Sequence, residues 1–192
     1  MSLDILKQFN WIDILVVIIL LRIGYVALSS GFPVELFKLL GIIAAIYLSL
    51  HYYTVWAHSF QQVAVLKLIP EGILIPISFL LLVLVGDMFF VFLRAIFYRF
   101  LKLEAAPNLN KWGGFLLGLA RGILTVSLII CFFTISGITY LNKSVNESYS
   151  GKSLFKIAPT VYDSLWKNIT YKFMPQEKFN NSIYTTKAEP KS

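Results

Sequence analysis

Four long apolar segments, separated by short polar connections, constrain this chain more than any other feature of its sequence. The segments run over Ile12–Leu28, Val34–Tyr53, Ile73–Leu93 and Phe115–Leu141. Each is close to the roughly 20 apolar residues that a helix needs to cross a hydrocarbon core about 30 Å thick. Hydrophobic residues make up 57% of the chain, more than one soluble core of 192 residues can absorb. We therefore predict an all-α polytopic membrane protein with four transmembrane helices.

The connections between these segments support the prediction of a helical bundle. Residues 29–33 read SSGFP, in which Gly31 permits a positive φ and Pro33 can open a new helix. The first two segments are therefore expected to form a tight helical hairpin. Tryptophan and tyrosine suit the membrane–water interface, and such residues lie near the segment ends: Trp11, Tyr52, Tyr53, Trp56, Tyr98, Trp112 and Tyr140.

The composition of the chain changes after the fourth apolar segment, which divides it into three parts. Residues 1–141 are expected to form the four-helix transmembrane domain. Residues 142–175 are more polar but keep a helical rhythm, in which apolar residues recur every three or four positions: Leu154, Ala158, Val161, Leu165 and Ile169. This pattern predicts a C-terminal amphipathic helix that lies on the membrane or on the bundle. Residues 176–192 are expected to be disordered.

Basic residues predict an orientation in the membrane, and their placement argues against nucleic acid as a partner. The net charge is +7, but the lysines and arginines lie mostly in connections and in the tail. One side of the membrane is expected to hold the third connection with Arg22, Lys38, Arg94, Arg99, Lys102, Lys111 and Arg121. The other side holds Lys7, Lys67, Lys143, Lys152 and Lys156. Because the first side holds more basic residues, the sequence predicts that the third connection is cytoplasmic and that both termini are external.

The sequence offers no recognisable catalytic, cofactor or metal site. It lacks the signatures of nucleotide-binding loops, nucleophile elbows and zinc-binding helices. Cys131 is the only cysteine and lies within an apolar segment, which predicts a buried packing residue. His51 and His58 have no carboxylate cluster at ligand spacing, which makes a metal site improbable. We expect a protein that is not an enzyme and binds no cofactor or metal.

Small residues recur every four positions on two of the predicted helices. Gly114, Gly118 and Gly122 share one face of the fourth segment. Gly41, Ala45 and Ser49 form a similar row on the second segment. Small residues at this spacing let helix backbones approach closely, which matters in lipid because hydrophobicity no longer drives association. The rows predict close packing within the chain, or else a face for self-association.

Charged residues in or near the predicted spans are the second group of candidates. Asp13, Glu35, Lys38 and Arg94 lie near segment ends, whereas Arg22 and Asp87 lie deeper. A charge at bilayer depth costs at least about 2.5–3.5 kcal/mol, so such residues usually pair, line a wet cavity or reach the interface. Interfacial or paired structural charges are the favoured interpretation, and a polar conduit is the alternative.

The same residues carry a resemblance to a known family. Asp13, Arg22 and Gly24 precede Gly31-Phe32 and Glu35, and a later stretch reads GFLLGLARG over residues 114–122. Ser153-Leu154 and Ala158-Pro159 follow. In these features the chain resembles the colicin V production protein family of bacterial inner-membrane proteins, over roughly residues 10–170. An Asp often precedes the glycine-rich stretch in that family, where this chain has Asn108-Leu109-Asn110-Lys111.

The resemblance implies a multi-pass protein of the bacterial inner membrane that supports toxin biosynthesis or export, or envelope maintenance, without catalytic residues. A small channel or transporter is the alternative. The expected partners are the lipid bilayer, and the chain itself or other envelope and export proteins. The candidate functional or packing residues are Asp13, Arg22, Gly24, Gly31, Glu35, Asp87, Gly114, Gly118, Arg121 and Gly122.

Overall fold

The computed structural model describes residues 10–63, 66–100 and 107–188, and their regular structure is helical. The long helices are α2 (Trp11–Ser30), α3 (Phe32–Gln62), α4 (Glu71–Phe100) and α5 (Gly114–Ile135). A 3-10 turn, η1 (Leu66–Leu68), precedes α4, and a π-helical turn, η2 (Leu109–Gly113), leads into α5. The shorter elements that follow are α6 (Thr139–Glu147), α7 (Tyr149–Leu154), α8 (Ile157–Leu165), η3 (Trp166–Thr170), α9 (Tyr171–Phe173) and α10 (Ser182–Ala188).

Local sequence explains how α2 begins and how the chain turns into α3, but the two helices diverge after the turn and do not form the tight hairpin that the sequence predicted. The Asn10 side chain caps α2 by accepting a hydrogen bond from the backbone N–H of Ile12 at 3.1 Å, and the Asp13 carboxylate accepts one from the Asn10 N–H at 2.9 Å. This reciprocal arrangement is a capping box. At the far end, Gly31 has φ +81°, and Pro33 occupies the first turn of α3, where its missing N–H leaves no bond unmade.

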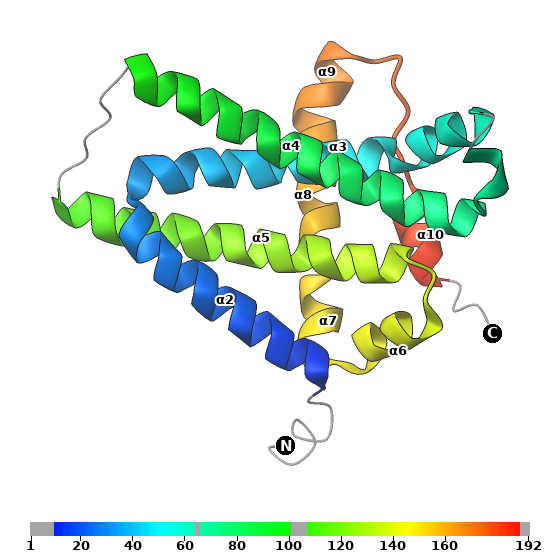
Figure 1. Ribbon diagram of the computed structural model, residues 1–192, viewed down its shortest axis with the longest axis horizontal. Helices are drawn as coiled ribbons and strands as arrows, with labels where there is room; N and C mark the ends of the chain where they lie inside the picture. The colour runs from blue at the N-terminus through cyan, green and yellow to red at the C-terminus, as the bar shows by residue number, and fades with distance from the viewer. Residues whose placement is uncertain (1–9, 64–65, 101–106, 189–192) are drawn as a thin grey trace.

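The four long helices are stacked side by side. In Figure 1, α4 crosses in front of α3, and α2 runs obliquely below α5. α3 packs chiefly against α4, α2 packs chiefly against α5, and α3 meets α5 between them. Helices α2 and α4 therefore pack chiefly on different partners within the bundle. The fully buried core lies along the seams and includes Ile12, Ala45, Ile46, Leu50, Phe79, Val126 and Ile130.

All four long helices are long and apolar enough to cross a membrane. The spans are Trp11–Ser30, Phe32–Gln62, Glu71–Arg99 and Leu109–Ile135, with mean hydropathies of 2.3, 1.8, 2.5 and 2.2. Large apolar side chains such as Leu21, Met88 and Leu116 are exposed on their outer surfaces, as expected of faces that lipid covers. The prediction of an all-helical protein with four potential spans is confirmed.

The fourth span ends earlier than its apolar composition predicted. We expected it to continue to Leu141, but α5 ends at Ile135 and α6 begins at Thr139. Gly137 between them has φ +68°, a conformation that interrupts a helix. Tyr140 and Leu141 therefore belong to a separate short helix. Hydropathy alone could not show this break because the residues on both sides of Gly137 remain apolar.

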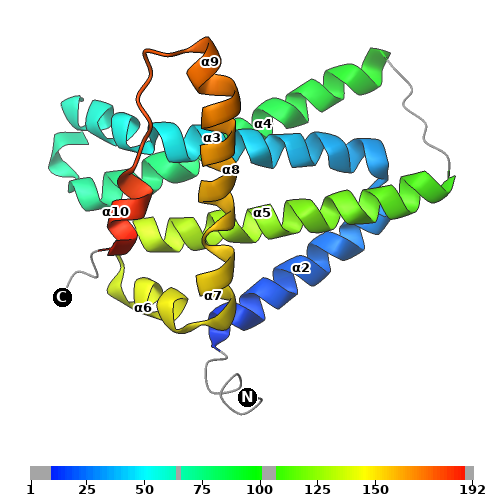
Figure 2. The same ribbon diagram turned by 180° about the vertical axis from the view of Figure 1, so that it is seen from behind.

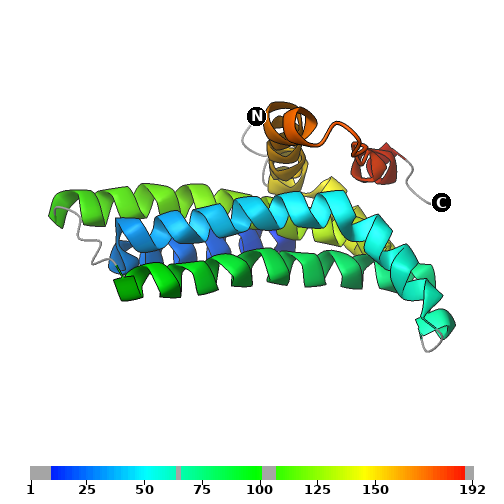
Figure 3. The same cartoon turned by 90° about the horizontal axis from the view of Figure 1, so that it is seen from above.

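The C-terminal helices cross the bundle instead of extending it. Figure 2 shows α7, α8 and α9 running across one face at a steep angle to the long helices, and Figure 3 shows them on one side of the layer. Ser127 of α5 fixes this crossing, because its hydroxyl donates to the Leu154 carbonyl at 2.6 Å and accepts from the Ala158 N–H at 2.8 Å.

The residues that this crossing segment buries follow only part of the line that periodicity indicated, since Ala158 is fully buried and Leu154 is partly buried. Tyr162 is fully buried and Trp166 is 8% exposed, while Ile169 is 51% exposed. Val161 is only partly buried. Two aromatic residues, Tyr162 and Trp166, therefore contribute to the contact with the bundle.

The last described segment is helical where the sequence predicted disorder for residues 176–192. Helix α10 packs against α5, and its Ile183 is fully buried. The composition of this stretch is polar, so its order depends on specific hydrogen bonds, described below, that composition does not reveal. Residues 189–192 lie outside the described part of the chain.

Candidate functional site

A buried carboxylate, Glu35, lies at the hairpin end of the bundle between two basic side chains. Its Oε2 accepts a hydrogen bond from Nε of Arg121 at 2.9 Å, and its Oε1 accepts one from Nζ of Lys38 at 2.6 Å. The Glu35 side chain is completely buried, and those of Arg121 and Lys38 are 16% and 24% exposed. Lys38 also donates to Oγ of Ser30 at 3.1 Å. We call Glu35, Lys38 and Arg121 the ionic cluster.

Within the ionic cluster, Arg121 and Lys38 compensate the negative charge of Glu35, whose burial would otherwise be costly. An unpaired carboxylate in a low-dielectric interior costs several kcal/mol, whereas charge-assisted hydrogen bonds at these distances offset much of that cost. Glu35 and Lys38 lie one turn apart on α3, and Arg121 comes from α5. The cluster is therefore an ionic crosslink between two helices whose positions are fixed by packing.

Glycine packing brings the helices close enough for this crosslink to form. A Cβ atom added at Gly118 would overlap the Cβ of Ala27 on α2 and would lie 3.5 Å from Oε2 of Glu35. A Cβ added at Gly114 would lie 2.9 Å from the backbone carbon of Gly31. In the structure these glycines thus face α2 and the hairpin turn of the same chain. Gly118 lies three residues before Arg121, on the same side of α5.

Two further glycines predicted from the sequence lie along the same seam. A Cβ at Gly24 would lie 3.4 Å from the Phe115 ring, and one at Gly122 would lie 3.1 Å from Leu20 and 3.4 Å from Ile23.

The second row of small residues, which begins at Gly41 on α3, packs against α4 instead. There the contact depends on Gly86, which the pattern analysis did not include, because a Cβ at Gly86 would lie 2.6 Å from the backbone of Ala45.

The hairpin turn is held by Asn110, a residue that sequence reasoning noted only as a departure from the family pattern. Its Oδ1 accepts a hydrogen bond from the backbone N–H of Phe32 at 2.8 Å. A side chain at Gly31 would strike this same amide and would also be strained by the positive φ. The only sequence signal for Asn110 was its position just before the glycine-rich stretch, where an oxygen-bearing side chain can cap a neighbouring turn.

Asp13 lies in the first turn of α2, far from the ionic cluster, and binds the C-terminal helices. Its Oδ1 accepts hydrogen bonds from both the backbone N–H and the hydroxyl of Ser150 at the start of α7, the former at 2.8 Å. Nearby, the Trp11 indole donates to Oγ of Ser144 at 3.1 Å. The side chain of Asp13 therefore anchors the C-terminal helices to α2, and neither serine was identified from the sequence.

Arg22 and Asp87 are not part of the ionic cluster. Both side chains are exposed, on α2 and α4 respectively, and neither forms an ion pair or a side-chain hydrogen bond with any residue in the described ranges. Asp87 faces Gly41 and borders a small surface pocket with Lys38 and Arg94. Arg22 and Asp87, which the sequence analysis placed deeper in the spans, are thus exposed side chains outside the ionic cluster.

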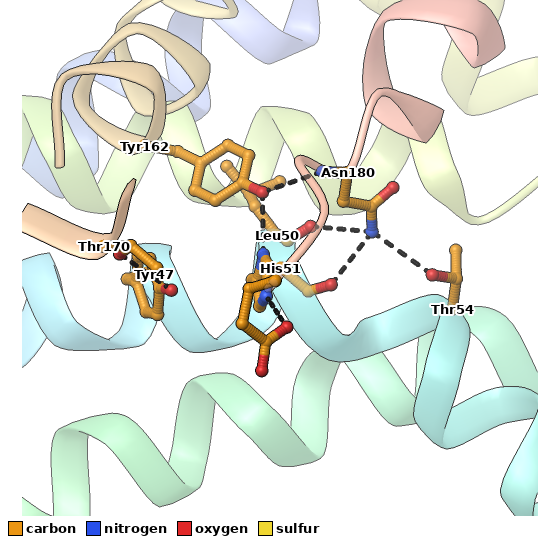
Figure 4. Close-up of polar contacts among 8 residues, drawn as sticks. Tyr47, Leu50, His51, Thr54, Tyr162, Thr170 and Asn180 are labelled. Carbon is orange, nitrogen blue, oxygen red and sulfur yellow. Dashed lines mark hydrogen bonds and ion pairs between the residues drawn. The ribbon is translucent and has the colours of Figure 1, made fainter. Parts of the chain in front are cut away.

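A second polar cluster, which the sequence did not predict, docks the C-terminal segment on α3. Figure 4 shows His51 facing Tyr162, with Nδ1 of His51 2.9 Å from the Tyr162 hydroxyl. Nε2 of His51 lies 3.3 Å from Oε2 of Glu177, and the His51 ring stacks on Trp166 at 5.3 Å. Burial raises the pKa of Tyr162 to about 12. The hydrogen bond that its hydroxyl accepts from the Asn180 N–H lowers the pKa by a smaller amount. Because Tyr162 is fully buried, we interpret this cluster as a structural latch.

Asn180 completes the latch by binding the backbone of α3. Its Nδ2 donates to the carbonyls of Leu50 at 3.1 Å and His51 at 3.0 Å, and it lies 3.2 Å from Oγ1 of Thr54 (Figure 4). Its backbone N–H donates to the Tyr162 hydroxyl at 3.0 Å. The hydrogen bonds of Asn180 thus hold the polar segment before α10 against α3.

The arrangement of these side chains can crosslink helices. The buried carboxylate of Glu35 already binds the side chains of Arg121 and Lys38. Within the described residues, no group of three His, Cys, Asp or Glu side chains could hold a metal ion. A hollow between α3, α4 and α5 is apolar, lined by residues such as Ile42, Phe79 and Leu128. These features are those of a packed membrane bundle.

Comparison with known proteins supports the resemblance drawn from the residues. A family model described as colicin V production protein matches residues 12–159, well over half of the chain. The match includes the ionic cluster, the glycines that face α2, and the contacts of Ser127 with Leu154 and Ala158. No curated protein and no solved structure matches the chain. The resemblance proposed from the sequence is confirmed at the level of the family.

Proposed function

Since the chain belongs to the colicin V production protein family, we propose that it is a non-enzymatic component of the bacterial inner membrane. In this role it supports toxin biosynthesis or export, or maintenance of the envelope, by assembling with other membrane proteins. One observation carries the proposal: the buried Glu35 is bound in a fixed crosslink, while Arg22 and Asp87 are exposed and stand outside it.

This distribution of charge favours a scaffold over a transporter. A transporter places ionisable groups or broken helices around a path near the middle of the bilayer. Here Glu35 is already bound by Arg121 and Lys38, and the hollow between α3, α4 and α5 is apolar. Charges on the outer surface are costly in lipid but useful where another protein covers them.

A small channel or transporter is the second candidate, and one observation favours it. Asp87, Lys38 and Arg94 border a common pocket, and Lys38 also binds the buried Glu35. Polar groups thus extend from the interior of the bundle to its surface on α4. A solute path would use this series of side chains.

Reconstitution in liposomes separates the two candidates. The parent, Asp87→Asn and Arg22→Gln chains are compared for ion and solute flux, with the exposed substitution Lys167→Gln as a control. The scaffold proposal expects no flux from any chain, together with co-purification of envelope or export proteins from cells. Flux in the parent that Asp87→Asn abolishes and Lys167→Gln preserves would establish the channel instead.

A cellular assay tests the supporting role directly. A strain that lacks this chain is expected to release less peptide toxin, or to become sensitive to detergents, and the parent gene should restore the defect. Glu35→Ala, which removes the centre of the ionic cluster, should fail to restore it. Full restoration by a chain that no longer accumulates in the membrane would contradict a direct role.

We also propose that the third connection faces the cytoplasm and both termini face outward. The basis is the excess of basic residues at the hairpin end of the bundle, which includes Arg94, Arg99 and Lys111. Alkaline phosphatase fused to the C-terminus should then be active. An inactive fusion, with a fluorescent cytoplasmic reporter at the same position, would reverse the orientation.

A further inference from the structure

The segment that crosses the bundle through α7, α8, η3 and α9 carries apolar and charged residues on opposite sides. Three of its apolar residues are each followed two positions later by a charged residue: Leu154 by Lys156, Val161 by Asp163, and Leu165 by Lys167. Two positions are about 200° of rotation at 3.6 residues per turn, so the two sets lie on nearly opposite sides of the helix. We call the three apolar residues the apolar line, and Lys156 and Lys167, with Lys152 one turn earlier, the basic line.

Neither line makes the main contact of the crossing segment with the bundle. That contact lies between the two lines and includes the buried side chains of Tyr162 and Trp166. The residues of the apolar line are only partly buried, and the lysines of the basic line are exposed. Lys152 and Lys156 form no ion pair with any residue in the described ranges.

The two lines face opposite ends of the bundle. Figures 1 and 2 show α10 on the side of the crossing segment that is away from the turn between α2 and α3. The Tyr184 hydroxyl of α10 donates to the Pro159 carbonyl at 3.3 Å. Burial and, to a smaller extent, the nearby Asp163 carboxylate raise the pKa of Tyr184. The side that carries Asp163 and the basic line therefore faces away from the turn, and the apolar line faces toward it, along the spans.

The crossing segment lies near one boundary of the hydrocarbon core. Oγ1 of Thr170 donates to the Tyr47 hydroxyl of α3 at 2.9 Å. Tyr47 is six residues before Tyr53, where the apolar segment of α3 ends, and therefore about 9 Å from that end at 1.5 Å per residue. Amphipathic helices of the membrane interface bury their apolar faces about 5–10 Å into the boundary between headgroups and acyl chains. The crossing segment thus has the depth of an interfacial helix, and its two lines have the matching directions.

We propose that the crossing segment lies in the membrane interface and binds anionic phospholipid, with the apolar line among acyl chains and the basic line against lipid phosphates. Charge complementarity favours this occupant, because exposed lysines face the end of the bundle where the headgroups lie. The tip beyond Thr170 fits the same layer, since Phe173 is 80% exposed and Met174 is 56% exposed. This placement also explains why the bundle buries the apolar line only in part. Such attachment is compatible with a scaffold and with a channel.

Spin labels test the directions of the two lines. In a Cys131→Ala background, the full chain carries Val161→Cys, Leu165→Cys or Lys156→Cys, is labelled at that position and is reconstituted in liposomes. Oxygen, which concentrates among acyl chains, should relax the labels at positions 161 and 165, and a water-soluble nickel chelate should relax the label at position 156. Leu116→Cys, exposed on α5, is the lipid-facing reference. Greater access of the chelate to positions 161 and 165 than to position 156 would overturn the proposal.

A fluorophore tests which lipid gathers at the crossing segment. Bimane on Leu165→Cys is quenched by brominated phosphatidylglycerol or by brominated phosphatidylcholine, each added in steps to otherwise unbrominated vesicles. The anionic lipid should quench at a mole fraction about fivefold lower or less, since one lysine near an anionic surface contributes about that factor in affinity. Ile77→Cys is the matched control and should be quenched equally by both lipids. Ile77 is exposed on α4, which Figure 3 shows on the other side of the layer.

Removal of lysines separates the headgroup contact from general attraction to an anionic surface. Lys152→Gln with Lys156→Gln should remove most of the preference for phosphatidylglycerol. Lys67→Gln with Lys111→Gln removes the same charge from exposed positions elsewhere and should preserve it.

Equal quenching by the two lipids in the chain with all its lysines would overturn the headgroup contact, as would an undiminished preference after Lys152→Gln with Lys156→Gln. Where that double variant fails to accumulate, the comparison of the two lipids on the chain with all its lysines decides. Normal toxin release by a chain that has lost the lipid preference would leave the proposed function intact.

Discussion

Nε of Arg121 lies 2.9 Å from Oε2 of Glu35, although 86 residues separate them in the chain. Because Glu35 is fully buried and also binds Lys38, its removal leaves two cations without their common partner. The pair therefore provides a direct test of how much the bundle depends on its ionic cluster.

We expect Glu35→Gln to lower the free energy of unfolding by about 3–5 kcal/mol, the range for breaking a buried pair by removing one partner. Arg121→Gln should cost less, because Glu35 keeps Lys38. The double variant should cost less than the sum of the two, since the groups are coupled. Thermal unfolding in detergent measures all three. The exposed pair Lys167–Asp163 at 2.7 Å is the control, and Lys167→Gln should change stability by less than about 1 kcal/mol. Additive effects would show that the pair is not coupled.

Among the glycines of α5 that face α2, Gly118 should be the most sensitive to substitution. Gly118→Ala is expected to destabilise the protein by about 1–3 kcal/mol, because the new methyl group overlaps the Cβ of Ala27. Ala27→Gly should recover part of this loss in the double variant. Gly122→Ala is the matched control with a smaller effect, since its nearest neighbour is the end of the Leu20 side chain at 3.1 Å. The larger Gly118→Leu should lower the amount of protein in the membrane. Normal accumulation and stability of Gly118→Leu would show that this face is not closely packed.

The Asp13 anchor makes a third prediction. Asp13→Ala removes the capping box of α2 and the acceptor for Ser150, so we expect a loss of about 1–3 kcal/mol. Ser150→Ala removes only the hydroxyl donor and should cost less, because the backbone N–H of residue 150 remains. Protease cleavage within α6 and α7 should increase in parallel. Equal stability of Asp13→Ala and the parent would indicate that the C-terminal helices are held elsewhere.

The latch around Tyr162 predicts a dependence on alkaline pH. Burial raises the pKa of Tyr162 to about 12, from an unfolded value near 10. The folded state thus holds this proton more tightly, so the contribution is fully present below pH 10 and is lost as the pH rises from 10 to about 12. Tyr162→Phe should remove this part of the alkaline loss of stability. A tyrosinate absorbance titration of the two proteins should differ by one group that ionises near pH 12. A difference near pH 10 would mean that Tyr162 is accessible to water.

The sequence was sufficient to predict the four helices and much of the site. Long apolar segments predict spans because lipid requires them, and Gly31 and Gly118 stand out because their spacing and neighbours are unusual. Glu35 and Arg121 were both candidates, but no local pattern could show that they meet, since their contact depends on how α3 and α5 pack.

Other parts of the structure left no usable signal in the sequence. Ser127 and Ser150 are single serines whose importance comes from backbone groups brought to them by distant helices. Asn180 lies in a polar tail that composition assigns to disorder, and its role depends on carbonyls of α3. Gly137 ends α5 within a stretch that is apolar on both sides. In each case a tertiary contact or one backbone angle outweighs the average character of the segment.

The docking of α10 has a consequence for the order in which the protein is made. Ile183 is among the most completely buried of the described residues, yet it comes long after the last long helix, α5, which ends at Ile135. The long helices are synthesised and inserted first, so for a time they exist without the segment that closes over α3 and α5. Completion of the fold must therefore wait until Ile183 has been synthesised, and a ribosome stalled near residue 180 would leave an open bundle exposed to membrane proteases.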